Sequence, residues 1–142
     1  MKLEQKNVFI TGSSRGIGLA IAHKFASLGA NVVLNSRGEI SEELLNEFKP
    51  YGVKVLAISG DVSDFTDAKR MVDQAIEELG SVDVLVNNAG ITQDTLMLKM
   101  TEEDFEKVLK INLTGAFNMT QAVLKQMIKA REGAIINMSS VV

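Results

Sequence analysis

The chain has 142 residues, of which 46% are hydrophobic and 23% charged, the balance of one folded domain rather than of a disordered segment. A formal net charge of -3 argues against a broad nucleic-acid-binding surface, and the absence of cysteine excludes disulfides, thiolate metal sites and thiol catalysis. The N-terminus lacks a signal-peptide core, and no apolar run approaches the roughly 18 residues of a membrane-spanning helix. We therefore expect a soluble, cytoplasmic protein that binds neither nucleic acid, membrane nor metal.

Five short runs rich in β-branched residues predict strands. They lie at residues 8–10, 31–34, 53–58, 82–86 and 134–138. Each run is apolar on both sides of the pleat, which is typical of parallel strands covered on both faces.

Amphipathic helical patterns occupy the intervals between these runs. The first extends to about Gly29, and the second follows the candidate N-cap Ser41. The third is predicted to begin at a Ser63 N-cap and to stop at Gly80. This alternation with right-handed crossovers predicts an α/β fold, a Rossmann-type doubly wound parallel sheet.

The fourth helical pattern is the longest. It begins at Thr101, with Asp104 placed for a capping box, and continues to about Lys129. Asn112 and Gly115 interrupt it, and because Asn disfavours helix interiors we predict a kink there. The interruption is either a functional feature or an inert irregularity.

A glycine-rich turn follows the first strand and opens the first helix, with the sequence Thr11-Gly12-Ser13-Ser14-Arg15-Gly16-Ile17-Gly18. Gly12 permits a sharp turn, Gly16 lets the backbone approach a pyrophosphate, and Gly18 lets the helix pack close to the strand. The helix N-terminus offers free N–H groups and a positive dipole end to an anion. By itself, the motif is also compatible with a plain strand-to-helix turn.

The Thr-Gly-x-x-x-Gly-x-Gly spacing resembles the short-chain dehydrogenase/reductase family. Four further segments of that family's pattern occur in the expected order: Asp61-Val62, Asn87-Asn88-Ala89-Gly90, Asn112 and Ser139-Ser140. Within the family, the chain is most similar to bacterial 3-oxoacyl-[acyl-carrier-protein] reductases, through residues 11–18, 87–98, 108–117 and 133–142. Acyl-CoA and polyol reductases carry similar segments.

The resemblance implies a nicotinamide cofactor, and the residues favour NADP. An NAD-binding fold places an acidic residue near the ribose 2′-OH about 20 residues after the glycines, whereas here Arg37 ends the second strand. A guanidinium, with Arg15 beside it, suits a 2′-phosphate. Alternatively, Arg37 is an exposed loop charge.

The remaining cofactor contacts are implied by the resemblance. Asp61 accepts from the adenine amino group with Val62 alongside, unless Asp61 is only a turn residue. The segment Asn88-Ala89-Gly90 passes under the cofactor, and residues 12–18 hold the pyrophosphate. The predicted domain is therefore an NADP-binding Rossmann domain over residues 1–142.

The resemblance also implies reduction of a ketone by NADPH. In the family a serine polarises the carbonyl and an asparagine orders a water relay, and these match Ser140 and Asn112. A tyrosine and a lysine four residues later complete the family's site. The only tyrosine is Tyr51, and Val55 stands four residues on. The resemblance therefore implies a fragment, truncated after the fifth strand, and we expect it to be inactive alone.

The implied reaction is the reduction of 3-oxoacyl-[acyl-carrier-protein] in fatty-acid biosynthesis by a homotetrameric parent enzyme, with the acyl carrier protein thioester as substrate. Two alternatives stay open. One is reduction of another ketone, such as acetoacetyl-CoA, and the other is a non-catalytic NADP-binding module. An unpaired edge on the fifth strand and uncovered apolar faces predict that the chain alone is poorly stable or prone to aggregate.

Overall fold

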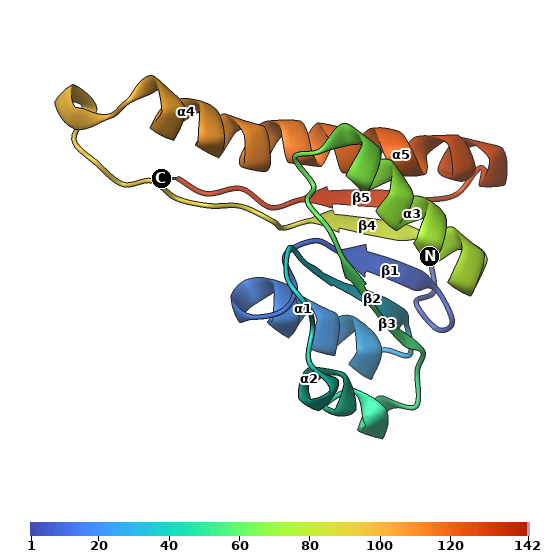
Figure 1. The fold of residues 1–142 in the computed structure, drawn as a ribbon. Helices are drawn as coiled ribbons and strands as arrows, with labels where there is room; N and C mark the ends of the chain where they lie inside the picture. Colours follow the sequence, from blue (N-terminus) through green and yellow to red (C-terminus); the bar gives the residue numbers. More distant parts are fainter. Residues whose placement is uncertain (142) are drawn as a thin grey trace.

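The computed structural model describes residues 1–141, so Val142, the last residue of the predicted domain, lies outside the described residues. Five parallel strands form one sheet with helices on both faces (Figure 1). The strands are β1 Asn7–Ile10, β2 Asn31–Ser36, β3 Val55–Ser59, β4 Val84–Asn87 and β5 Ala134–Asn137. The predicted Rossmann-type α/β architecture is confirmed.

The strand order in the sheet is β3-β2-β1-β4-β5. The chain thus adds β2 and β3 on one side of β1, then crosses back to add β4 and β5 on the other. Ile10 pairs with both Leu34 of β2 and Val86 of β4, so the reversal falls at the carboxyl ends of β1 and β4. In doubly wound folds, a crevice opens at this switch point and binds ligands.

The helices form two layers over the sheet (Figure 1), with α1 and α2 on one face and α3 and α5 on the other. They are α1 Gly16–Ser27, α2 Glu42–Asn46, α3 Phe65–Leu79, α4 Glu102–Leu109 and α5 Gly115–Ala130. Short 3₁₀ turns occupy Lys49–Tyr51 and Met97–Lys99, and a π-helical turn, Lys110–Thr114, joins α4 to α5.

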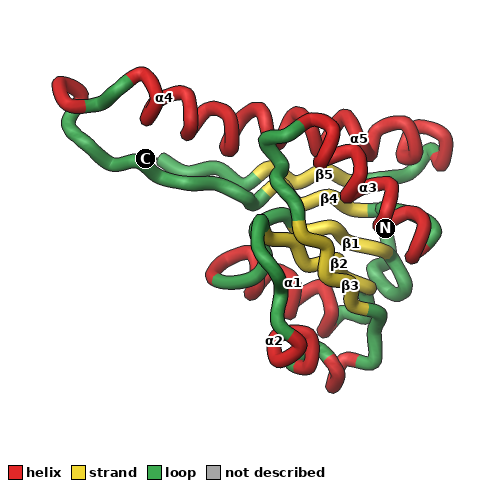
Figure 2. Tube along the Cα trace, in the orientation of Figure 1, coloured by secondary structure: helices red, strands yellow, loops and turns green. Residues whose placement is uncertain are grey.

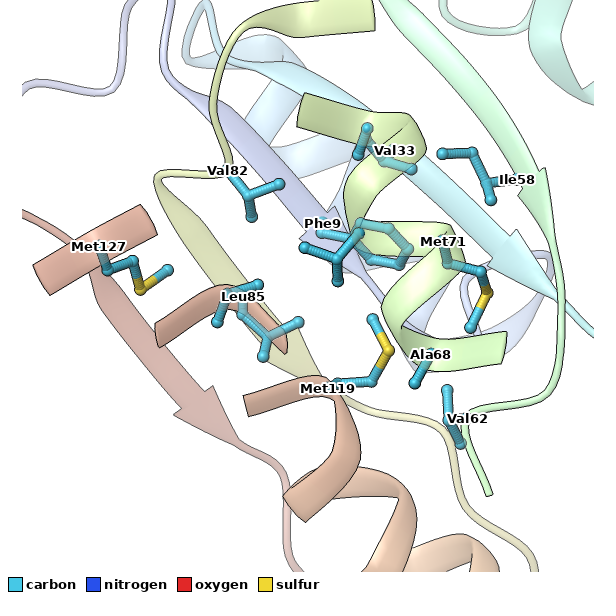
Figure 3. Close-up of a cluster of buried hydrophobic side chains, with 13 residues drawn as sticks. Phe9, Val33, Ile58, Val62, Ala68, Met71, Val82, Leu85, Met119 and Met127 are labelled. Atoms are coloured by element: carbon cyan, nitrogen blue, oxygen red, sulfur yellow. The ribbon is translucent and has the colours of Figure 1, made fainter. Parts of the chain in front are cut away.

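Alternation along β1 divides the core in two. Val8 and Ile10 pack with α1 and α2, whereas Phe9 points to the opposite face and packs with α3 and α5. Figure 3 shows Phe9 among Met71 of α3 and Met119 of α5. All of these side chains are fully buried, so the apolar runs that predicted the strands are also what holds the helices to the sheet.

Most helix ends agree with the sequence predictions. The Ser41 hydroxyl accepts from the Leu44 N–H, Thr101 and Asp104 form a reciprocal capping box, and α3 stops at Gly80 with φ 94°. The Ser63 N-cap is wrong. Asp64 caps α3 by accepting from the Asp67 N–H, because Ser63 donates its own N–H and hydroxyl to Asp61.

The long helix is irregular around Asn112, where a π-helical turn joins α4 to α5, whereas the kink itself stays a prediction. Beyond the sheet, the loop after β4 and the segment after β5 run side by side below this long helical rod (Figure 2). Within the described residues β5 lies at the sheet edge, and α5 exposes Phe117 and Ile128. The expected low stability of the chain stays a prediction.

Candidate functional site

A groove of about 1270 Å³ lies at the carboxyl ends of the strands. Its walls come from the glycine turn, the segment 87–94 after β4, the start of α4, the π-helical turn, the start of α5 and the segment 137–140 after β5. Segments that resembled one family in the sequence therefore meet around one space at the topological switch point.

Gly12 and Gly16 adopt left-handed backbone conformations, with φ values of 61° and 59°. A Cβ at Gly12 would lie 2.9 Å from the Ala89 Cα, and one at Gly18 would lie 2.4 Å from both the Gly12 carbonyl oxygen and the Asn88 Nδ2. A Cβ at Gly16 would meet nothing within 4 Å. Gly12 and Gly18 thus permit packing, whereas Gly16 leaves an open backbone face.

The glycine turn and the segment after β4 are locked together by hydrogen bonds. The Thr11 hydroxyl accepts from the N–H groups of Asn88 and Ala89 at 3.0 and 2.9 Å. Asn88 Nδ2 in turn donates to the carbonyls of Thr11 and Gly12 at 3.1 and 3.0 Å. The Asn88 side chain is therefore engaged in shaping the turn.

The underside of the turn is held by two buried polar side chains. The Ser13 hydroxyl donates to the Ile10 carbonyl at 2.7 Å and accepts from the Asn35 N–H at 2.9 Å. Asn35 accepts from the Gly12 N–H and donates to the Ile58 carbonyl at 3.2 and 3.0 Å. Ser13 points into the protein, so its side chain fixes the loop from below.

The N-terminus of α1 faces the groove without a side-chain cap. Arg15 occupies the N-cap position in extended conformation and makes no capping hydrogen bond. Both Arg15 and Ile17 are exposed and line the groove, and Ser14 is half-buried beside them. Uncapped N–H groups and the positive helix end create a place for an anion.

Arg37 is exposed just beyond β2 and does not line the groove itself. Within the described residues, its guanidinium makes no hydrogen bond or ion pair. The next residue is tightly held, because the hydroxyls of Ser36 and Ser59 donate to the Gly38 carbonyl at 2.7 and 2.8 Å. The arrangement leaves a free cation on a fixed loop.

Asp61 and Val62 lie after β3, at the same edge of the sheet. One carboxylate oxygen of Asp61 accepts from the Ser63 N–H and hydroxyl at 2.9 and 2.7 Å. Val62 is buried, lines the groove, and accepts at its carbonyl from Asn118 Nδ2 at 2.9 Å.

Asn112 sits in the π-helical turn and is bound to the opposite wall of the groove. Its Oδ1 accepts from the Ile91 N–H at 2.8 Å, and its Nδ2 donates to the Ile91 carbonyl at 2.9 Å. Gly90 permits this approach, because a Cβ there would lie 3.3 Å from the Asn112 Oδ1. The side chain thus fixes the loop after β4.

Ser140 lines the groove together with Asn112 and the segment 88–90. Below them, Asn87 donates from Nδ2 to Thr120 and Asn137 at 3.1 and 2.9 Å. Its Oδ1 is the one buried side-chain polar atom that lacks a partner among the described residues.

Two contributors to the site were not predicted from the sequence: Thr11 as a hydrogen-bond hub, and Asn35. Thr11 belongs to the glycine turn, and Asn35 lies just past the run 31–34 that predicts the second strand; both are polar and buried. Such residues are buried at a cost unless bonded, which marks them as structural links.

The comparisons with known proteins agree with this geometry. A model of the short chain dehydrogenase family matches residues 6–142. The chain belongs to the short chain dehydrogenase family. It is 45% identical over 139 residues to the 3-oxoacyl-[acyl-carrier-protein] reductase FabG of Staphylococcus aureus (strain N315), covering 96% of this chain and 56% of that protein.

Two further relatives carry the same description. The FabG protein of Staphylococcus epidermidis (strain ATCC 12228 / FDA PCI 1200) is 44% identical over 139 residues, covering 96% of this chain and 57% of its own length. The FabG protein of Thermotoga maritima is 44% identical over 146 residues, covering 100% of this chain and 58% of its own length. The chain thus spans somewhat more than half the length of the curated relatives it matches.

Two further properties concern the part of the chain that the structure describes. None of its helices combines the length and apolar character required to cross a bilayer. Among the same residues, no three His, Cys, Asp or Glu side chains gather in a way that suits a metal ion.

Proposed function

We propose that this chain forms the NADP-binding part of an NADPH-dependent reductase that converts 3-oxoacyl-[acyl-carrier-protein] to the 3-hydroxyacyl form in fatty-acid biosynthesis. The observation that carries this proposal is the groove, which is lined by the glycine turn, Asn112 and Ser140 together. Its support is the 44–45% identity to reductases of that name.

The residues present fit a dinucleotide. The α1 N-terminus is uncapped, and the Gly16 backbone face is open, which suits the approach of a pyrophosphate. Asn87 lines the same groove, and its buried Oδ1 lacks a hydrogen-bond partner among the described residues. Residues 12–18 and 88–90 would hold the cofactor, with Asp61 and Val62 at its adenine end.

The choice of NADP over NAD rests on Arg37 and Arg15. Arg37 makes no ion pair with any described residue, so its planar fork of donors is available for a 2′-phosphate dianion. The hydroxyls of Ser36 and Ser59 hold the neighbouring Gly38 carbonyl, which limits the movement of the loop. An acid at this place would repel the phosphate.

When bound, NADPH supplies the hydride for the ketone carbon. In our proposal the Ser140 hydroxyl donates a hydrogen bond to the ketone oxygen, where negative charge develops. Asn112 keeps the loop after β4 against the π-helical turn, which maintains the groove wall.

The product hydroxyl needs a proton donor in addition to the hydrogen bond from Ser140. Tyr51 does not line the groove. It packs on the sheet face covered by α1 and α2, where its hydroxyl is bonded to His23 at 3.0 Å. This observation favours a second candidate, a module that binds NADP without catalysis by this chain alone.

The homotetramer, the cytoplasmic location and the acyl carrier protein substrate are parts of the leading proposal, and acetoacetyl-CoA is the alternative substrate.

The leading proposal is tested by following NADPH oxidation with acetoacetyl-[acyl-carrier-protein] and with acetoacetyl-CoA. The protein assayed would carry this chain followed by its continuation through a Tyr-x-x-x-Lys segment. We expect faster turnover of the carrier-protein thioester, a large fall in kcat for Ser140→Ala, and no turnover by residues 1–142 alone. A preference for the CoA thioester would favour the alternative substrate, and a reading frame that ends here would favour the module.

A further inference from the structure

Asp67 and Arg70 lie in the first turns of α3 and close around the loop that follows β3. The Asp67 Oδ2 accepts from the Asp61 N–H at 2.7 Å, and its Oδ1 accepts from the Arg70 Nε at 2.7 Å. The Arg70 Nη2 then donates to the Ser59 carbonyl at 2.6 Å. One ion pair therefore binds the loop on both sides of Gly60.

Gly60 shows how closely the loop follows this pair. A Cβ on Gly60 would lie 2.7 Å from the Arg70 Nη2, 2.8 Å from the Asp67 Oδ2 and 2.5 Å from the Met71 Sδ. Its φ is not in the left-handed region, and the three close atoms are the ends of side chains, which a Cβ would push away from the loop. The backbone from Ser59 to Asp61 is thus seated directly on the α3 side chains.

The same loop is fixed from α5 at its next residue. Asn118 donates to the Val62 carbonyl, and a Cβ at Gly115 would lie 2.6 Å from the Val62 Cγ2. One carboxylate oxygen of Asp61 accepts from Ser63, and the other oxygen makes no hydrogen bond to any described residue. The loop is therefore held by contacts from both α3 and α5, and Asp61 presents one acceptor atom.

The pair contributes little to holding the helix itself. The side chains of Asp67 and Arg70 are 28% and 50% exposed, and exposed ion pairs stabilise proteins only slightly. Their contacts are instead directed to the carbonyl of Ser59 and the N–H of Asp61, which flank the proposed adenine contact.

We propose that Asp67 and Arg70 are positioning residues for the adenine end of the cofactor site. This inference rests on the proposed function. The pair holds the Asp61 backbone so that its free carboxylate oxygen and Val62 face an adenine ring, and the Arg70 charge offsets that of Asp67 beside Asp61.

The ionisation of Asp67 supports this role. Burial acts to raise the pKa of Asp67. The hydrogen bond from the Asp61 N–H and the Arg70 guanidinium lower this pKa and together outweigh burial, so the net shift is downward. Asp67 is therefore a carboxylate, and an acceptor for both partners, across the neutral range.

The test compares Asp67→Ala and Arg70→Ala with Asp73→Ala, which breaks the Lys69–Asp73 pair on the same helix but touches no loop. Binding of NADPH, of adenosine 2′,5′-bisphosphate and of reduced nicotinamide mononucleotide is measured by titration calorimetry. Thermal unfolding is followed in parallel, so that loss of structure is recognised.

We expect both single variants to bind NADPH and adenosine 2′,5′-bisphosphate about tenfold more weakly, since a charged hydrogen bond is lost in each. The double variant should be no weaker than either single one, because the two residues act as one unit. Binding of reduced nicotinamide mononucleotide, and all binding by Asp73→Ala, should be unchanged.

Equal affinities of the variants and the original chain for adenosine 2′,5′-bisphosphate would overturn the inference while leaving the proposed function intact. Equal weakening of both half-cofactors would also overturn it, because it would indicate a general structural role. Failure of the original chain to bind NADPH would contradict the proposed function itself.

Discussion

Asn112 binds both main-chain polar groups of Ile91, accepting from its N–H at 2.8 Å and donating to its carbonyl at 2.9 Å. The two residues are 21 positions apart and belong to opposite walls of the groove. The π-helical turn supplies the register that aims Asn112 at this loop, as such turns often do at functional sites.

The first prediction concerns this pair. Asn112→Ala should lower the free energy of unfolding by about 1–2 kcal/mol, because two hydrogen bonds in an exposed place are lost. It should also increase hydrogen exchange at the Ile91 amide. Asn46→Ala, at an exposed position without such a contact, is the matched control and should change neither quantity. Unchanged exchange at Ile91 would contradict the described contact.

Adjacent serines in the glycine turn provide a second test. The Ser13 hydroxyl is fully buried and bonded to Ile10 and Asn35, whereas Ser14 makes no hydrogen bond through its side chain to any described residue. Ser13→Ala should lower the free energy of unfolding by about 1–3 kcal/mol, and Ser14→Ala should leave it nearly unchanged. Urea denaturation measures both, and equal losses would mean that the turn is held differently.

The glycines of the turn should differ in tolerance to alanine. At Gly18 the new Cβ would collide with the Gly12 carbonyl and Asn88, which cannot both yield, at a cost of about 2–3 kcal/mol. At Gly16 the space is open, so the expected cost is the left-handed strain of about 1–2 kcal/mol. Thermal unfolding of the two variants checks the order, and a reversed order would refute it.

The capping box of α4 should be sensitive to acid. Hydrogen bonds from the Thr101 N–H and hydroxyl hold the pKa of Asp104 below its ordinary value of 3.8. A folded-state pKa that is depressed stabilises the protein above the unfolded value, and this stability is lost as pH falls through the folded value. Asp104→Asn should therefore lower Tm near neutral pH, by less and less as pH falls below 3.8. A constant difference across that range would exclude this linkage.

Much of the fold was predictable because local chemistry and global packing agree. The doubly apolar strands, the Ser41 and Thr101 caps and the Gly80 stop each follow from residues close in sequence. The error at Ser63 arose from competition, since Asp61 captures the Ser63 donors and leaves the cap to Asp64. Where two adjacent residues could both cap a helix, the hydrogen bonds of their neighbours decide which one does.

The components of the site were less accessible to sequence reasoning. The motif predicted which segments meet, but not that Thr11 and Asn88 exchange hydrogen bonds across 77 residues. Nor does spacing show that Ser13 turns inward or that Arg70 reaches the Ser59 carbonyl. These contacts depend on the sheet register, which brings the carboxyl ends of β1, β2, β3 and β4 to one edge.

We propose that NADPH is bound jointly by the glycine turn at the groove and by Arg37, which lies just beyond β2. The most direct test is a fluorescence titration of this chain with NADPH and with NADH, alongside an Arg37→Asp variant. We expect NADPH to bind more tightly than NADH and the variant to lose this preference, because an acid there repels the 2′-phosphate and accepts from a ribose hydroxyl. Equal binding of both cofactors by the original chain, or NADPH preference kept in the variant, would contradict the assignment.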